Sequence, residues 1–98
     1  MTRELSARRS LGEARRYREY AAYLIDCAAE GEPHYDPERD RERVTNNLRA
    51  ALAHELWAAR QRDQLSAAEF TVGEAMLGSW HGSNLSEFVA AIRAVAAE

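Results

Sequence analysis

The chain has 98 residues, 46% of them hydrophobic and 30% charged, and a formal net charge of -3 at pH 7. This length fits one domain over residues 1–98 that buries about two thirds of its unfolded surface, and so apolar a composition excludes an intrinsically disordered chain. All 13 basic residues are arginines, a bias that GC-rich coding explains, and the 16 acidic residues exclude a chain that is basic overall, as nucleic-acid-binding proteins often are.

The first predicted helix covers about residues 5–30 and ends at Gly31. β-Branched residues never alternate over a strand length here or elsewhere, whereas Ala, Leu, Arg and Glu dominate, so we expect helices and no sheet. Apolar positions at helical spacing form one face of this first helix, namely Leu11, Ala14, Tyr17, Ala21, Leu24, Ile25 and Ala28.

Arginines alternate with tyrosines over residues 15–23 of this helix, a composition that phosphate grooves and protein interfaces share. One interpretation is structural: Tyr17 joins the apolar face, Tyr20 lies at its border, and the neighbouring arginines form salt bridges. The alternative is that Arg16 and Tyr23, which fall on the arginine-bearing face, mark a contact surface for a partner.

The second predicted helix covers residues 36–64 and has a clear start. Asp36 is suited to cap the helix, and Pro37 to occupy its first position, where the missing N–H has no intrahelical partner. At helical spacing this helix is apolar on two opposite sides. The main stripe consists of Val44, Leu48, Ala51, Leu52, Leu56 and Ala59, and the second, narrower stripe of Ala50, Ala53 and Trp57.

Two apolar stripes mean that the second helix must be covered twice, because a surface helix needs only one. We expect it to be the central rod of a bundle, in which the first helix or the C-terminal pair covers Trp57. The alternative is that the second stripe packs on another chain. That chain would be a second copy in a homodimer, where each subunit offers the same patch, or a different protein.

Two short helices are predicted to follow. Ser66 with Glu69 forms a capping box that opens the third helix, which ends near Gly78. Asn84 with Glu87 reproduces a capping arrangement and opens the fourth helix. The fourth helix has a clear amphipathic pattern through Leu85, Phe88, Val89, Ile92, Val95 and Ala96.

The turn over residues 78–83 carries Trp80 and His81, which either plug the end of the bundle or anchor a partner. The four predicted helices account for nearly the whole chain. The predicted fold is therefore all-α, a compact four-helix bundle with two long helices followed by two short ones.

Acidic residues and one histidine alternate where the first two helices are connected, a pattern that calcium loops also show. The positions are Glu30, Glu32, His34, Asp36, Glu38 and Asp40. The spacing of an EF-hand is not met, because Tyr35 stands where that loop needs glycine and Arg41 where it needs a carboxylate. We therefore predict a solvated loop and no metal site.

The three histidines, His34, His54 and His81, lie in three different predicted elements. No zinc-protease motif, nucleophile elbow or phosphate-cradling glycine loop accompanies them. We therefore expect a protein that is not an enzyme and carries no cofactor.

The segment from Leu52 to Phe88 resembles a helix-turn-helix regulator of the phage-repressor type, chiefly through residues 65–70, which read Leu-Ser-Ala-Ala-Glu-Phe. The resemblance covers less than half the chain and implies DNA binding through residues 52–91. It departs from the pattern where DNA would be contacted, because residues 83–91 contain no Arg or Lys, although phosphate attraction normally supplies much of the affinity. DNA binding is therefore the alternative function.

The sequence favours a protein that acts by binding another protein, as a regulator, an adaptor, an inhibitor or a small subunit of a bacterial assembly. The predicted partner-binding residues are Arg16, Tyr23, Trp57, Trp80 and His81. The acidic connection from Glu32 to Asp40 is expected to steer a basic partner. A single cysteine, Cys27, and the lack of an apolar run long enough for a signal peptide or a membrane span predict a cytoplasmic location.

Overall fold

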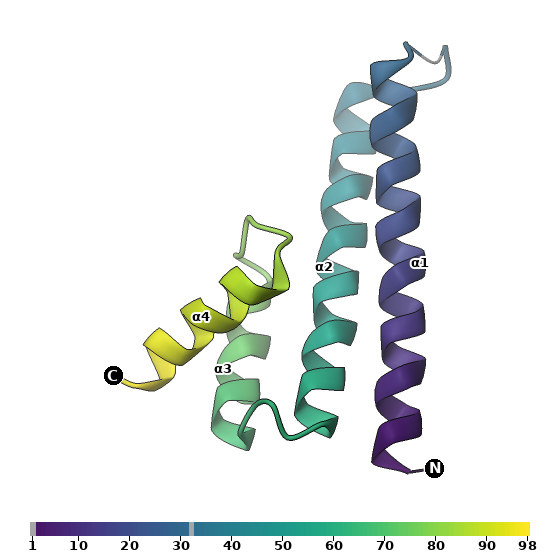
Figure 1. Cartoon of the computed structure of the whole chain (residues 1–98). Helices are drawn as coiled ribbons and strands as arrows, with labels where there is room; N and C mark the ends of the chain where they lie inside the picture. Colours follow the sequence, from purple (N-terminus) through teal and green to yellow (C-terminus); the bar gives the residue numbers. More distant parts are fainter. Residues whose placement is uncertain (1, 32) are drawn as a thin grey trace.

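The computed structural model describes residues 2–31 and 33–98 of the chain. The described residues form no strand and four helices: α1 (Arg3–Ala29), α2 (Pro37–Gln61), α3 (Ala67–Leu77) and α4 (Leu85–Ala96). The predicted all-α class, with two long helices followed by two short ones, is confirmed. α1 and α2 form an antiparallel hairpin, and α3 and α4 pack beside α2 at the end of the hairpin that holds the N-terminus (Figure 1).

Side-chain caps start three of the helices where the sequence predicts. Asp36 Oδ1 accepts a hydrogen bond from the backbone N–H of Glu38 at 3.0 Å. α3 opens with the predicted capping box, in which Ser66 Oγ accepts from the N–H of Glu69 at 3.1 Å and the Glu69 carboxylate accepts from the N–H of Ser66 at 2.8 Å. The side chain of Asn84 caps α4. Each cap satisfies N–H groups that have no partner inside the helix.

Two helix boundaries differ from the sequence prediction. α1 begins earlier, at Arg3, because Thr2 Oγ1 accepts a hydrogen bond from the N–H of Leu5 at 3.1 Å and caps the helix there. α2 ends earlier, at Gln61. Its continuation is blocked by Asp63, whose backbone adopts the left-handed conformation with a φ of 59°.

α1 and α2 meet along a seam of mostly small side chains. On α1, buried residues recur at alternating steps of three and four, with half-buried Tyr17 among them: Ala7, Ser10, Ala14, Ala21 and Leu24. On α2 the same steps give Val44, Asn47, Ala51, His54 and Ala58. The rings of Tyr17 and His54 stack across the seam with centroids 5.7 Å apart. This is the spacing of a two-helix coiled coil, in which small side chains let the backbones approach closely.

The predicted apolar faces of the long helices are therefore partly wrong. Ile25, which follows the last buried residue of the seam, Leu24, is 52% exposed. Ala28 is exposed as well. Ala51 is buried on the side of α2 that faces α1, rather than on the same side as Leu52.

The other side of α2 supports a core of larger apolar side chains. Its buried members come from α2, α4 and the α2–α3 connection, namely Leu52, Leu56, Ala59, Leu65, Phe88 and Ile92. α3 packs against this core most closely at Gly73, where an added Cβ would lie 2.8 Å from carbons of both Leu56 and Ile92. α2 is thus covered on two sides, but its neighbours divide the main stripe between them. The second stripe of Ala50, Ala53 and Trp57 lies on a third side of the helix, and Trp57 is 41% exposed.

The molecule is flat, with extents of 45 × 34 × 16 Å and a radius of gyration of 15.0 Å. A compact domain of this length has a radius of gyration of about 13 Å. The accessible surface is 6447 Å², whereas a compact monomer of this mass exposes about 5,700 Å². The excess arises because α3 and α4 flank one end of the hairpin, and its other end, next to the α1–α2 connection, projects beyond them (Figure 1).

Candidate interaction surface on the helical hairpin

Two contacts between α1 and α2 mark the ends of one broad face of the hairpin. At one end, Trp57 Nε1 donates a hydrogen bond to Ser6 Oγ at 3.1 Å. Toward the α1–α2 connection, Arg43 donates a hydrogen bond to the Tyr20 hydroxyl, and its guanidinium carbon lies 5.4 Å from the centroid of the Tyr20 ring. Ser6 and Tyr20 are fourteen residues apart, as are Trp57 and Arg43, so each pair lies on one side of its helix.

We call this surface the hairpin face. It consists of Leu5, Ser6, Arg9, Glu13, Arg16, Tyr20 and Tyr23 of α1 and of Arg43, Ala50, Ala53 and Trp57 of α2. Leu5 and Arg16 precede Tyr23 by eighteen and seven residues, which places all three on one line of α1. We call the α1 residues of this face its α1 edge and the α2 residues its α2 edge. Glu13 lies midway along the α1 edge, and Ala50 lies midway along the α2 edge.

Most of the exposed large apolar side chains lie on the hairpin face. Six such side chains are exposed in the part of the chain that the structure describes: Leu5, Tyr20, Tyr23, Ile25, Trp57 and Val95. Only Ile25 and Val95 lie elsewhere. Scattered apolar side chains are normal on a protein surface, whereas a cluster rimmed by polar residues indicates an interaction site.

Trp57 is held in a fixed position at the edge of this face. Its indole N–H is bonded to Ser6 of α1, and its ring meets Phe70 of α3 edge-on with centroids 5.8 Å apart. The first helix and the C-terminal pair therefore each cover part of Trp57, and 41% of the residue stays exposed. A tryptophan with fixed orientation and an accessible ring is typical of an interface anchor.

The structure places Arg16 and Tyr23 on the same face as Trp57. Arg16 pairs with Glu13 at 3.5 Å, and its side chain is 79% exposed. Tyr23 is 60% exposed and stacks on Tyr20 with ring centroids 6.2 Å apart. Three of the five predicted partner-binding residues thus lie on the hairpin face, although they come from different helices and Trp57 and Tyr23 lie toward its opposite ends.

Trp80 and His81 are not part of the hairpin face. Trp80 packs against the core and tilts onto Phe88 with ring centroids 5.1 Å apart, so it closes the end of the core, as one of the two sequence interpretations expects. An added Cβ at Gly82 would lie 3.0 Å from Trp80 Nε1, so glycine lets the connection pass over the indole. His81 is exposed in that connection.

A second cluster lies at the projecting end of the hairpin. A pocket of about 390 Å³ opens there, lined by Tyr20, Tyr23, Leu24, Cys27, His34, Tyr35, Arg39, Asp40 and Arg43. Asp40 is only 2% exposed. Its carboxylate accepts hydrogen bonds from Arg39 Nε at 3.2 Å, from Arg43 Nη1 at 3.1 Å and from the backbone N–H of Asp36 at 2.9 Å. The Arg39 side chain, together with that backbone N–H, holds the pKa of the Asp40 carboxyl at about 2.

Sequence reasoning missed this role of Asp40 and treated it as one more charge of a solvated connection. The available signal was its spacing, because Arg39 is adjacent and Arg43 is one helical turn away.

The acidic residues of the α1–α2 connection bear on the question of a metal site. Asp36 and Asp40 both bond within the chain, and Glu32 lies outside the described residues. Among the residues that are described, no three His, Cys, Asp or Glu side chains are grouped so that they could hold a metal ion.

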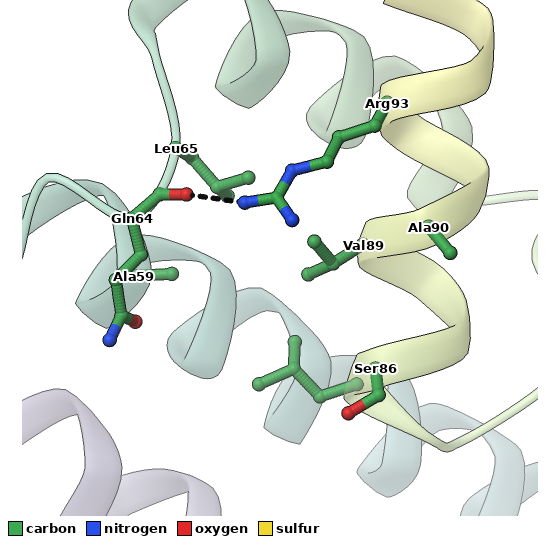
Figure 2. Close-up of a pocket in the computed structure, with 8 residues that line it drawn as sticks. Ala59, Gln64, Leu65, Ser86, Val89, Ala90 and Arg93 are labelled. Carbon is green, nitrogen blue, oxygen red and sulfur yellow. Dashed lines mark hydrogen bonds between the residues drawn. The ribbon is translucent and has the colours of Figure 1, made fainter.

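A second pocket, of about 380 Å³, lies between α4 and the α2–α3 connection (Figure 2). Its lining is mostly apolar, and the one cation in it is Arg93, which donates a hydrogen bond to the Gln64 carbonyl at 2.9 Å. Arg93 also pairs with Glu69 at 3.5 Å. The only basic side chain of α4 is therefore engaged within the chain, and residues 83–91, which the helix-turn-helix resemblance assigns to the DNA groove, present none.

Comparison of the chain with models of known protein families, with curated proteins and with solved structures found no match. None of the helices in residues 2–31 and 33–98 combines the length and the apolar character that crossing a membrane requires. The surfaces of the chain itself are therefore what points to its function.

Proposed function

We propose that this protein is a non-enzymatic helical protein that acts by binding another protein through the hairpin face. The observation that carries this proposal is the gathering of exposed Leu5, Tyr20, Tyr23 and Trp57 on one surface. Tyrosine, tryptophan and arginine supply most of the binding energy in protein interfaces, and all three occur on this face.

Fixed geometry on the hairpin face supports the same proposal. Trp57 is positioned by Ser6 and Phe70, and Tyr20 by Arg43. Side chains that are already ordered lose less conformational freedom when a partner binds, so they contribute more net affinity.

The expected roles are those of a regulator, an adaptor, an inhibitor or a small subunit of a larger bacterial assembly in the cytoplasm.

Fewer acidic side chains of the connection from Glu32 to Asp40 can attract a basic partner than the sequence suggests. Asp36 caps α2 and Asp40 is buried in an ion pair, so within the described residues 33–40 the exposed acidic side chain left to attract a basic surface is Glu38.

Affinity capture with matched variants tests the proposal. Tyr23 and Ile25 are both exposed, at 60% and 52%, and lie on opposite sides of α1 only two residues apart. We expect the tagged full chain to capture a specific protein from its source cell, Tyr23→Glu to lose it, and Ile25→Glu to retain it. Equal capture by the two variants, or loss only with Ile25→Glu, contradicts binding through the hairpin face.

A further inference from the structure

We propose that the partner on the hairpin face is a second copy of the chain, packed antiparallel about a two-fold axis that passes beside Ala50 and Glu13. This inference rests on the proposed function and identifies its partner. A two-fold interface joins the same patch of both subunits, so the patch must be complementary to itself. The hairpin face meets this condition along its α2 edge.

The α2 edge is complementary to itself about Ala50. Arg43, Ala50 and Trp57 follow one another at seven-residue steps on this edge. A two-fold axis beside Ala50 that reverses the helix direction brings Trp57 of each copy against Arg43 of the other. A guanidinium over an indole ring is a favourable cation–π pair, and the symmetry forms this pair twice. Arg43 already lies over the Tyr20 ring within each chain, so the two indoles complete aromatic clusters that exist in the monomer.

The α1 edge carries charges of both signs. Arg9, Glu13 and Arg16 follow one another along it, and Glu13 pairs with Arg16 within the chain at 3.5 Å. Antiparallel packing about Glu13 brings Arg16 of each copy within one helical turn of Glu13 of the other, and level with Arg9 of the other. The α1 edge therefore forms like-charge as well as opposite-charge contacts, and the self-complementarity of the face rests on its α2 edge.

The centre of the face has the small side chains that close packing of two helices needs. Ala50 and Ala53 are half-buried, and neither places a long side chain over the axis. Two α2 helices can therefore approach at the short end of the range for packed helices, about 8 to 10 Å between axes. The large anchors, Trp57 and Tyr23, lie toward the ends of the face, where they pack around this close contact.

Sedimentation of the full chain tests the dimer. We expect a species of twice the chain mass of 11.1 kDa. Trp57→Glu should weaken dimerisation by about thirtyfold or more, as truncation of an interface anchor does, while the circular dichroism spectrum stays helical. If Trp57→Glu does not fold, Tyr23→Glu is used in its place to test dimerisation, because the Tyr23 side chain is not part of the core. Ile25→Glu, on the other side of α1, should leave the dimer intact.

Cysteine cross-linking tests the axis itself. In a Cys27→Ser background, Ala50→Cys should form an intermolecular disulfide under mild oxidation, because a residue beside a two-fold axis meets its own copy within the short Cα separation that a disulfide spans. Ala94→Cys, exposed on α4, is the matched control and should stay monomeric on a non-reducing gel. Cross-linking at position 94 but not at position 50 overturns the proposed axis.

The failure of the dimer and the failure of the proposed function are distinguishable. A wild-type chain that sediments at 11.1 kDa at every concentration overturns the dimer. If such a chain captures a different protein, and Tyr23→Glu but not Ile25→Glu loses it, the hairpin face is a binding surface with another partner. A dimer that Trp57→Glu and Tyr23→Glu both leave intact overturns the role of the hairpin face in self-association.

Discussion

The two sides of α2 are covered in different ways. Toward α1 the helix presents small and polar side chains at the spacing of a coiled coil, whereas toward α3 and α4 it presents Leu52 and Leu56 to large side chains such as Phe88. A seam of alanines buries little apolar area per residue but fixes the distance between two backbones. Most of the hydrophobic stabilisation should therefore lie on the side of α3 and α4, and the close fit on the side of α1.

The largest expected effect tests the core on the side of α3 and α4. Phe88 is fully buried, so Phe88→Ala should lower the free energy of unfolding by about 3 to 5 kcal/mol, measured by urea denaturation. Val95 lies on the same helix and is 44% exposed, so Val95→Ala should cost about 0.5 kcal/mol or less. Similar costs for the two variants would contradict a core centred on Phe88.

The next effect tests the fit of the seam. Ala14 is 2% exposed between α1 and α2, so Ala14→Leu should destabilise the chain by about 1 to 3 kcal/mol through overpacking. Ala22 lies on the exposed side of the same helix, and Ala22→Leu is the matched control, expected to have little effect on thermal unfolding. A stable Ala14→Leu variant would show that the seam has space for larger side chains and is not a close contact.

A smaller effect separates helix capping from partner binding. Asp36→Ala removes the acceptor for the N–H groups of Glu38 and Arg39 and should cost about 0.5 to 2 kcal/mol. Partner capture under folding conditions should be unchanged, because Asp36 lies off the hairpin face. Loss of capture at unchanged thermal stability would instead assign the α1–α2 connection to the binding surface.

The smallest expected effect is a loss of stability that appears only at acidic pH. The pKa of Asp40 is about 2 in the folded chain, and an unfolded aspartate has a pKa of about 3.9. The charged carboxylate therefore stabilises the fold above about pH 4, and this contribution is lost as the pH falls toward 2. We expect thermal stability to fall less over this range in Asp40→Asn than in the wild type. Parallel pH profiles would mean that the carboxylate is not clamped by Arg39.

The fold could be predicted because its signals are local. Asp36, Ser66 and Asn84 cap helices where the sequence places them. Helical periodicity identifies the apolar positions of α2, but not which of them its neighbours cover. The partition of its apolar positions between two neighbours could not be predicted. That partition depends on the rotation of α2 relative to α1, which the seam fixes through contacts such as the one between Tyr17 and His54.

The hairpin face was predicted only in pieces for a related reason. The sequence marks Arg16 and Tyr23 on one helix and Trp57 on another, and no local pattern says that they share a surface. The hydrogen bond from Trp57 to Ser6 reveals it, because it sets the register of the two helices. The sequence marks Trp80 as a possible anchor because exposed tryptophan is rare, whereas the structure places it against the core.

Photo-cross-linking in the source cell tests the central claim most directly, because it reports which side of the hairpin meets another protein. A photoreactive phenylalanine analogue replaces either Tyr23, on the hairpin face, or Ile25, on the opposite side of α1. We expect a specific cross-linked product from position 23 and none from position 25, and its mass identifies the partner as a second copy or another protein. Products from position 25 alone, or from neither position, would contradict a protein-binding hairpin face.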